Sequence, residues 1–191
     1  PYVVSFDDPI GHIRMNSKAK NELATAGYLY RENEGIDLDN DVVANRIIPT
    51  PKKVSIAKSG ELDLSNGINV ELANIELASI DMALANLARN GINQTTNGVK
   101  LNVNVNEKLD TGAGSYKLEI SKDNISIVAA DESGAFYGVQ SLAALVMPNS
   151  SVVKLQSIED APRYQYRGHH VDVGRNFHGV NFIRTLIEQM A

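Results

Sequence analysis

The sequence has no cysteine and no tryptophan among its 191 residues, and aromatic side chains make up only 6% of it. Without thiols, disulfide bonds and thiolate metal sites are excluded. The cellular compartment is not fixed by this absence, because exported bacterial domains can also lack cysteine. Any carbohydrate-binding surface would have no indole ring for a sugar to stack on. The length allows one sizeable domain with appendages.

Clustered positive charge and long apolar runs are also absent. The chain has 18 Lys and Arg residues against 23 Asp and Glu, for a formal net charge of -5. Because nucleic-acid binding requires clustered cations that displace counterions, we expect no nucleic-acid partner. No run of about 18 apolar residues occurs, so we expect no membrane span. An export signal, if the protein has one, is expected upstream of Pro1.

Residues 1–45 form a polar lead-in, in which the pattern favours a helix over residues 17–31. The stretch that follows has an aspartate at every second position: Asp37, Asp39 and Asp41. This spacing resembles the beginning of a calcium-binding loop, but such a loop needs glycine at its sixth position and glutamate at its twelfth. Here those positions hold Val42 and Ile48. A solvated acidic linker is therefore the favoured interpretation.

Residues 46–160 alternate between strand-like and helix-like patterns. Strands are expected over residues 54–57, 62–64, 68–72, 101–105, 116–121, 124–128 and 152–156, and helices over 77–87 and 136–146. Each helix has one apolar face, and Asn90-Gly91 and Pro148 supply the end signals. The order predicts an α+β domain in which a mixed β-sheet carries helices on one face.

Residues 161–191 have a different pattern from the residues before them. Residues 167–173 are strand-like, residues 174–179 form a polar turn, and apolar residues then recur at helical spacing: Phe182, Ile183, Leu186, Ile187 and Met190. A second domain is therefore expected to begin at about residue 161. Because no glycine or polar cap closes the final helix, we interpret the chain as a fragment of a longer protein.

Histidines and one arginine are the candidate chemical groups of this segment. His169 and His170 are adjacent, so on a strand they point to opposite faces and cannot bind one ion together. A zinc site that combines either of them with His178 and Asp172 fits no common ligand spacing. A histidine hydrogen-bonded to a neighbour is favoured over a metal ligand. Arg167, at the start of the predicted strand, could equally pair with a surface acid.

Three blocks of sequence carry a family resemblance. They are RIIPTPK at residues 46–52, DESGAFYGVQSL at 131–142, and APRY at 161–164 followed by YRGHHVDVGRNFH at 166–178. Together they resemble the β-N-acetylhexosaminidases of glycoside hydrolase family 20, and the bacterial chitobiase branch in particular. The blocks follow the family's order and cover about residues 46–191, which makes the match more specific than any single motif.

The resemblance implies an accessory α+β domain over residues 46–160. It also implies that residues 161–191 begin a catalytic (β/α)8 barrel, with its first strand and part of its first helix. In the family, the arginine that matches Arg167 hydrogen-bonds hydroxyls of the non-reducing sugar, a role that suits a planar guanidinium. Further matching residues are expected to support the first strand and its loop, or to shape the pocket wall: Asp172, Arg175 and Asn176.

The implied reaction removes terminal non-reducing N-acetylhexosamine from chitin-type oligosaccharides. It retains configuration through assistance from the substrate's own N-acetyl group, and needs no cofactor. The family uses an Asp-Glu pair on a later barrel strand, and this sequence has no matching region. Asp131-Glu132 is instead expected at a helix start, where acids complement exposed N–H groups. We therefore expect the chain alone to be inactive, and the parent enzyme to require the remainder of the barrel and an N-acetylglucosamine-containing oligosaccharide.

The implied location is periplasmic, outer-membrane-associated or secreted in a bacterium. His169 and His170 depart from the family, which has apolar barrel residues there, so one imidazole is expected to face the interior beside a polar partner. Two alternatives stay open. One is a non-catalytic carbohydrate-binding or interaction module, whose terminal strand would offer unpaired edges to a partner. The other is the accessory domain of a different barrel glycosidase, such as an α-glucuronidase.

Overall fold

The computed structural model describes residues 26–35, 47–106, 108, 112–147, 149–175 and 177–190. The chain forms two units, Pro1–Ala44 and Asn45–Ala191. The described part of the first unit holds helix α1 (Ala26–Asn33), which overlaps the end of the helix predicted for residues 17–31. The rest of that predicted helix and the aspartates of the acidic stretch (Asp37, Asp39 and Asp41) lie outside the described residues.

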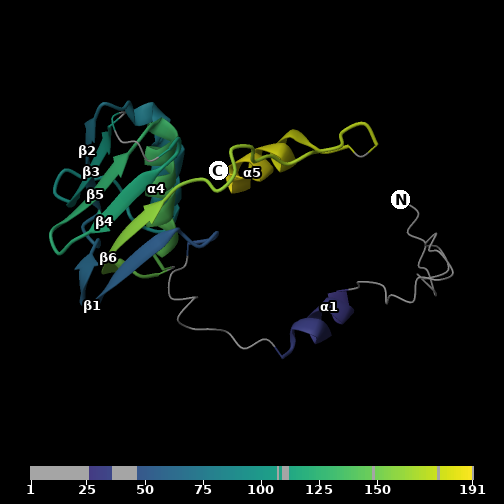
Figure 1. Ribbon diagram of the computed structural model, residues 1–191, viewed down its shortest axis with the longest axis horizontal. Helices are drawn as coiled ribbons and strands as arrows, with labels where there is room; N and C mark the ends of the chain where they lie inside the picture. Colours follow the sequence, from purple (N-terminus) through teal and green to yellow (C-terminus); the bar gives the residue numbers. More distant parts are fainter. Residues whose placement is uncertain are drawn as a thin grey trace. The chain divides into compact units, whose positions relative to one another are not determined.

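The second unit is built on a mixed β-sheet, which has six strands in the described part of the chain (Figure 1). Their order across the sheet is β1-β6-β4-β5-β3-β2. The neighbours β2, β3 and β5 are parallel, whereas β4 is antiparallel to β5 and β6, and β1 is antiparallel to β6. The strands are β1 (Lys53–Asp63), β2 (Ile68–Ala73), β3 (Val99–Val105), β4 (Tyr116–Ile120), β5 (Asn124–Ala129) and β6 (Val152–Asp160).

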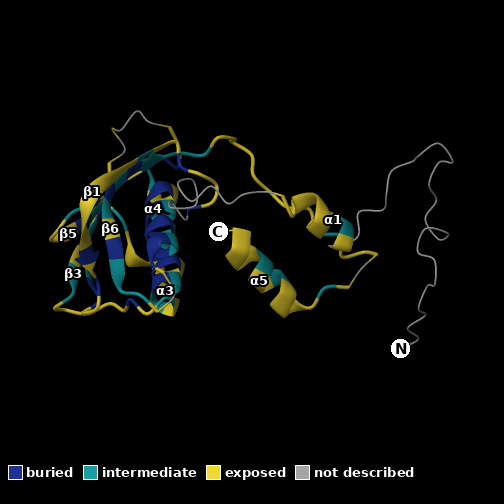
Figure 2. Ribbon diagram, turned by 90° about the horizontal axis from the view of Figure 1, so that it is seen from below, coloured by how far each residue is buried: buried dark blue, intermediate teal, exposed yellow. Residues whose placement is uncertain are grey.

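Two helices connect strands and cover one face of the sheet, as the sequence pattern predicts (Figure 2). Helix α3 (Asp81–Arg89), preceded by the 3-10 turn η2 (Leu77–Ser79), lies between β2 and β3, and α4 (Glu132–Leu145) lies between β5 and β6. Each helix joins strands that run in the same direction, which requires a crossover. Helix α5 (Val180–Met190) follows the sheet. Among the described residues, no helix is long and apolar enough to cross a bilayer.

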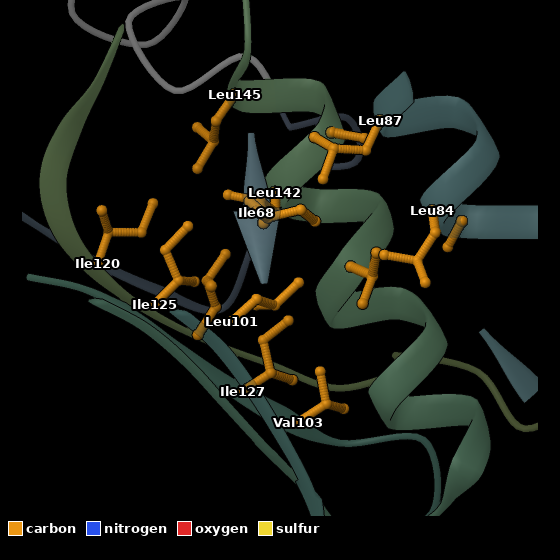
Figure 3. Close-up of a cluster of buried hydrophobic side chains, with 14 of the residues drawn as sticks. Ile68, Leu84, Leu87, Leu101, Val103, Ile120, Ile125, Ile127, Leu142 and Leu145 are labelled. Carbon is orange, nitrogen blue, oxygen red and sulfur yellow. The ribbon is translucent and has the colours of Figure 1, made fainter. Parts of the chain in front are cut away.

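The hydrophobic core lies between the sheet and these two helices (Figure 3). Strand side chains alternate: in β4, Tyr116, Leu118 and Ile120 are buried, whereas Lys117 and Glu119 are exposed. Burying one large aliphatic side chain contributes about 1.5–3 kcal/mol relative to leaving it in water. The largest fully buried side chains include Leu64, Ile68, Ile80, Leu87, Leu101, Ile125, Ile127 and Leu142.

The opposite face of the sheet carries polar and charged side chains. Among the described residues, three ion pairs lie on it: Lys53 with Glu159 at 3.0 Å, Lys100 with Glu71 at 2.8 Å, and Lys117 with Glu119 at 3.3 Å. All six side chains are about half exposed. Exposed pairs of this kind contribute at most about 1 kcal/mol each, so the fold depends on the helix-covered face.

The first strand is longer than the sequence pattern predicts. The strands expected at residues 54–57 and 62–64 form a single strand, β1. Its register with β6 shifts between Ile56 and Glu61, so that a bulge lies opposite Leu155. Gly60 lies in this bulge with φ of 103°, and a Cβ there would come within 2.8 Å of Leu155 Cδ1. The sequence pattern predicts two strands because the residues of the bulge interrupt the apolar pattern between them.

The strand predicted for residues 167–173 is not formed in this chain, which has no regular strand between residue 161 and residue 175. A parallel barrel strand requires neighbours for its backbone hydrogen bonds. None of the described strands pairs with this segment. The helix predicted after it is confirmed as α5. His169 and His170 are both exposed in this chain, and the inward-facing imidazole expected for the complete barrel stays a prediction.

Candidate functional site

A cavity of about 520 Å³ lies where the chain leaves β6. One wall is α4, another is the segment that precedes β1, and a third is the linker, defined here as residues 161–167. Aromatic rings, two side-chain amides, a carboxylate and guanidinium groups line it together. The lining residues that matter for its chemistry are Tyr116, Tyr137, Gln140, Asp160, Arg163 and Arg167.

The linker is fastened to the sheet domain at several points. Asp160, just before it, accepts a hydrogen bond from the backbone N–H of Lys52 at 3.1 Å. The linker's Pro162 lies so close to Gly114 that a Cβ on this glycine would approach Pro162 Cγ to 2.9 Å. These contacts fix the direction in which the chain leaves β6.

Arg167, the predicted sugar-binding residue, lies at the end of the linker and contacts α4. Its Nη2 donates a hydrogen bond to Tyr137 Oη at 2.8 Å. Its guanidinium carbon also lies 5.3 Å from the centroid of the Tyr137 ring, within the range of a cation–π interaction. The Arg167 side chain is exposed and borders the cavity. The structure thus places Arg167 in contact with Tyr137. The binding of sugar by Arg167 stays a prediction.

Two buried residues whose hydroxyl groups are in contact, Tyr116 and Ser141, are part of the cavity lining. Tyr116 Oη and Ser141 Oγ are 2.5 Å apart, and either can be the donor. Burial is the main reason that the pKa of Tyr116 rises to about 12, from a usual value of 10.0. This phenol is therefore neutral at physiological pH and acts in the cavity wall as a neutral hydrogen-bonding group.

Asp131 and Glu132 serve the start of α4, as predicted. Asp131 Oδ1 accepts from the backbone N–H of Gly134 at 2.8 Å, which is an N-cap bond, and Oδ2 accepts from the N–H of Gly114 at 2.8 Å. Glu132 accepts a hydrogen bond from the Ser79 hydroxyl at 3.0 Å. Both carboxylates are thus engaged in holding α4, which leaves them unsuited to be a catalytic pair.

Asp172 and Arg175 organise the turn that precedes α5. Asp172 Oδ1 accepts from the backbone N–H groups of Gly174 and Arg175, each at 3.0 Å, and Oδ2 accepts from the guanidinium of Arg175. The backbone bond from Arg175 and then its side chain hold the pKa of Asp172 below the usual value. The pair forms a local turn and is not among the cavity's lining residues. Asn176 lies outside the described residues.

The histidines do not form a shared site. His178 stacks on Phe182, with ring centroids 4.7 Å apart and an interplanar angle of 19°. His169 and His170 are exposed. Among the residues that the structure describes, no group of three His, Asp or Glu side chains is arranged to hold a metal ion.

Of the cavity's lining residues only Arg167 was predicted from the sequence, and Tyr137 is the most important of those that were missed. It falls within the block at residues 131–142 and in the helix predicted for residues 136–146, whose apolar face includes the buried Val139. One residue advances a helix by about 100°, which turns Tyr137 towards the border of that face. A tyrosine at such a border, with an apolar ring and a polar hydroxyl, is the signal that could have indicated a contact with a neighbouring segment.

Comparison with known proteins identifies the family. A family model described as glycosyl hydrolase family 20, domain 2, matches residues 44–161. The chain belongs to glycosyl hydrolase family 20. The model of the family 20 catalytic domain matches residues 164–191, the stretch that contains Arg167 and α5.

Relatives of this family 20 chain include two bacterial enzymes. A beta-hexosaminidase from Vibrio vulnificus is 37% identical over 169 residues, which cover 88% of this chain and 20% of the relative. An N,N'-diacetylchitobiase from Vibrio harveyi is 34% identical over 185 residues, which cover 94% of this chain and 20% of the relative. The chain therefore spans about a fifth of the length of the curated relatives it matches.

A solved structure has the same fold. It is a family 20 exo-β-N-acetylglucosaminidase from Vibrio harveyi in complex with N-acetylglucosamine. Its superposition has a TM-score of 0.63 at 26% sequence identity, and covers 77% of this family 20 chain and 24% of the other chain. The likeness supports the α+β sheet domain as a family feature.

Proposed function

We propose that the chain is the accessory domain and the beginning of the catalytic (β/α)8 barrel of a β-N-acetylhexosaminidase. In this proposal residues 1–45 lead in, residues 46–160 form the accessory domain, and residues 161–191 supply the first strand and part of the first helix of the barrel. The two family models, which match residues 44–161 and 164–191, support this division. The strand would form once neighbouring barrel strands offer it hydrogen-bonding partners.

The proposed reaction of the whole enzyme is removal of terminal non-reducing N-acetylhexosamine from chitin-type oligosaccharides by substrate-assisted retention. The names of the relatives support this substrate class, since they are a beta-hexosaminidase and an N,N'-diacetylchitobiase. The bound N-acetylglucosamine of the Vibrio harveyi structure supports it too. We place the enzyme in the periplasm, on the outer membrane or outside a bacterial cell, in line with the bacterial relatives.

The observation that carries the proposal is Arg167, an exposed guanidinium within the stretch that matches the catalytic domain. Its planar fork suits two neighbouring sugar hydroxyls. Because a guanidinium has five N–H donors, one bond to Tyr137 leaves donors for a substrate. Asp172 and Arg175 are proposed to support the loop beside it through their turn, with Asn176 as a third supporting residue.

The chain by itself is proposed to be inactive. Asp131 and Glu132 hold the start of α4. The other adjacent acids of the sheet domain, Glu159 and Asp160, end strand β6, where successive side chains point to opposite faces. Glu159 pairs with Lys53 on the polar face. Neither pair can act on one glycosidic bond, so catalysis requires acids from the remainder of the barrel.

A kinetic experiment on the full-length protein tests the proposal. We expect it to hydrolyse a chromogenic N-acetylglucosaminide, and the Arg167→Ala variant to lose about 10- to 100-fold in kcat/KM, the effect of a lost charged hydrogen bond. Arg184→Ala, which removes an exposed arginine from α5, is the matched control. The 191-residue chain alone should show no turnover. An inactive full-length protein would reject the proposed function, whereas an active protein indifferent to Arg167→Ala would reject only the role of this residue.

A second candidate function is a non-catalytic carbohydrate-binding module. The cavity beside the linker favours it, because tyrosine rings with guanidinium, amide and carboxylate groups are the chemistry that binds sugars. This candidate is tested by isothermal titration calorimetry, in which N-acetylglucosamine oligomers are added to the 191-residue chain. Binding that is lost in Gln140→Ala would support it, and no heat at millimolar sugar would exclude it.

A further inference from the structure

The contact between Arg167 and Tyr137 joins the proposed substrate-binding arginine to the accessory domain. Tyr137 belongs to α4, and Arg167 lies in the stretch that matches the catalytic domain. We propose that Tyr137 is a positioning residue that orients Arg167 for sugar binding. Through it, the accessory domain would affect the affinity of the active site for its substrate. This inference rests on the proposed function of Arg167.

Two different interactions fix the arginine on the tyrosine. The hydrogen bond from Nη2 to Tyr137 Oη, at 2.8 Å, fixes one edge of the guanidinium. The position of the guanidinium carbon 5.3 Å from the ring centroid adds an attraction to the π system. An exposed arginine would otherwise sample many rotamers, and holding it in one of them before substrate arrives lowers the entropy lost on binding.

Tyr137 is itself held in place. Its neighbour Gly138 brings α4 close to the sheet, since a Cβ there would lie 2.7 Å from Ile127 Cγ2. Its ring meets the ring of Phe136 edge to face, with centroids 5.9 Å apart at 76°. The other side of the ring approaches Gly114, where a Cβ would lie 3.3 Å from Tyr137 Cε2. The tyrosine is thus part of a packed wall and can act as a fixed support.

The linker brings Arg167 to this support from a fixed starting point. Pro162 packs against Gly114, and Arg163 is bonded to the segment before β1. Only three residues separate Arg163 from Arg167, so the position of the second arginine is restricted by the first. The linker and Tyr137 together set both the location and the orientation of the Arg167 guanidinium.

Steady-state kinetics of the full-length enzyme tests the positioning role. Tyr137→Phe removes the hydroxyl and keeps the ring, and Tyr137→Leu removes both interactions. Because contacts to sugar hydroxyls act on bound substrate and transition state alike, we expect KM for a chromogenic N-acetylglucosaminide to rise about five-fold in Tyr137→Phe and about ten-fold in Tyr137→Leu, with little change in kcat. The matched control is Tyr166→Phe, at a tyrosine that is 88% exposed.

A double-mutant cycle separates positioning from a general structural effect. If Tyr137 acts through Arg167, Tyr137→Phe will leave KM unchanged when Arg167 is already alanine. An unchanged KM in Tyr137→Phe, or an equal rise in both backgrounds, would overturn the inference while the proposed function stands. A full-length wild-type protein without hydrolase activity would overturn the proposed function, and the positioning role with it.

Discussion

The guanidinium of Arg163 donates a hydrogen bond to the backbone carbonyl of Thr50, with Nη2 and O 2.9 Å apart. The two residues are 113 positions apart in the sequence, and they join the segment before β1 to the linker after β6. Lys52 and Asp160 make a second bond between the same segments. The place where the chain enters the sheet domain and the place where it leaves are therefore tied together.

Removing the Arg163 side chain should loosen this tie. We expect Arg163→Ala to lower the free energy of unfolding of the 191-residue chain by about 0.5–1.5 kcal/mol, the net value of one hydrogen bond. Amide hydrogen exchange should also become faster in the linker but not in β4, whose core contacts are unaffected. Arg184→Ala is the control for loss of an arginine. Unchanged exchange in the linker would show that the other contacts suffice.

Asp131 should be the most important carboxylate for the stability of the sheet domain. It caps α4 and also binds the N–H of Gly114, so we expect Asp131→Ala to lower the free energy of unfolding by about 2 kcal/mol. Asp131→Asn keeps one acceptor oxygen, so it should lower the free energy of unfolding by about half as much as Asp131→Ala. Chemical denaturation measures both, with Glu61→Ala, on the exposed edge of β1, as the control. Equal stability of Asp131→Ala and Glu61→Ala would contradict the assignment.

Glycine at position 134 is required by the close approach of α4 to the turn that precedes β4. A Cβ on Gly134 would overlap the backbone carbonyl oxygen of Ser115, which cannot move aside like a flexible side chain. We expect Gly134→Ala to destabilise the chain by about 1–3 kcal/mol, the range for overpacking. Gly179→Ala is a matched control, because no atom lies within 4 Å of its added Cβ. Thermal unfolding of the two variants side by side checks the difference.

Much of the sheet domain could be predicted from local pattern. The alternation in residues 101–105 and 116–121 gave β3 and β4, because one face of each strand is buried and the other wet. The Asp131-Glu132 pair indicated the start of α4, since capping depends only on nearby backbone. The order of strands was not predicted, because pairings such as β1 with β6 join residues about a hundred positions apart.

The candidate site was less predictable, because it depends on contacts between distant segments. Arg167 was identified through its family motif, but its neighbour Tyr137 is 30 residues away and belongs to a helix. The strand predicted at residues 167–173 is not formed in this chain for a related reason: a strand-like sequence still needs neighbouring strands for its backbone hydrogen bonds. The single strand β1 was missed because the bulge that contains Gly60 interrupts the pattern, although the residues on both sides of it pair with β6.

The buried Tyr116–Ser141 pair should give the stability of the chain a distinctive alkaline dependence. The pKa of Tyr116 is about 12 in the folded chain against 10.0 when unperturbed, so its stabilising effect is complete below pH 10 and is lost as pH rises towards 12. A shift of two pKa units corresponds to about 2–3 kcal/mol. Tyr116→Phe with Ser141→Ala, which removes both hydroxyl groups together, should therefore flatten the fall in unfolding free energy between pH 10 and 12. Urea denaturation at several pH values measures this, and identical slopes in variant and wild type would show that Tyr116 is not the group responsible.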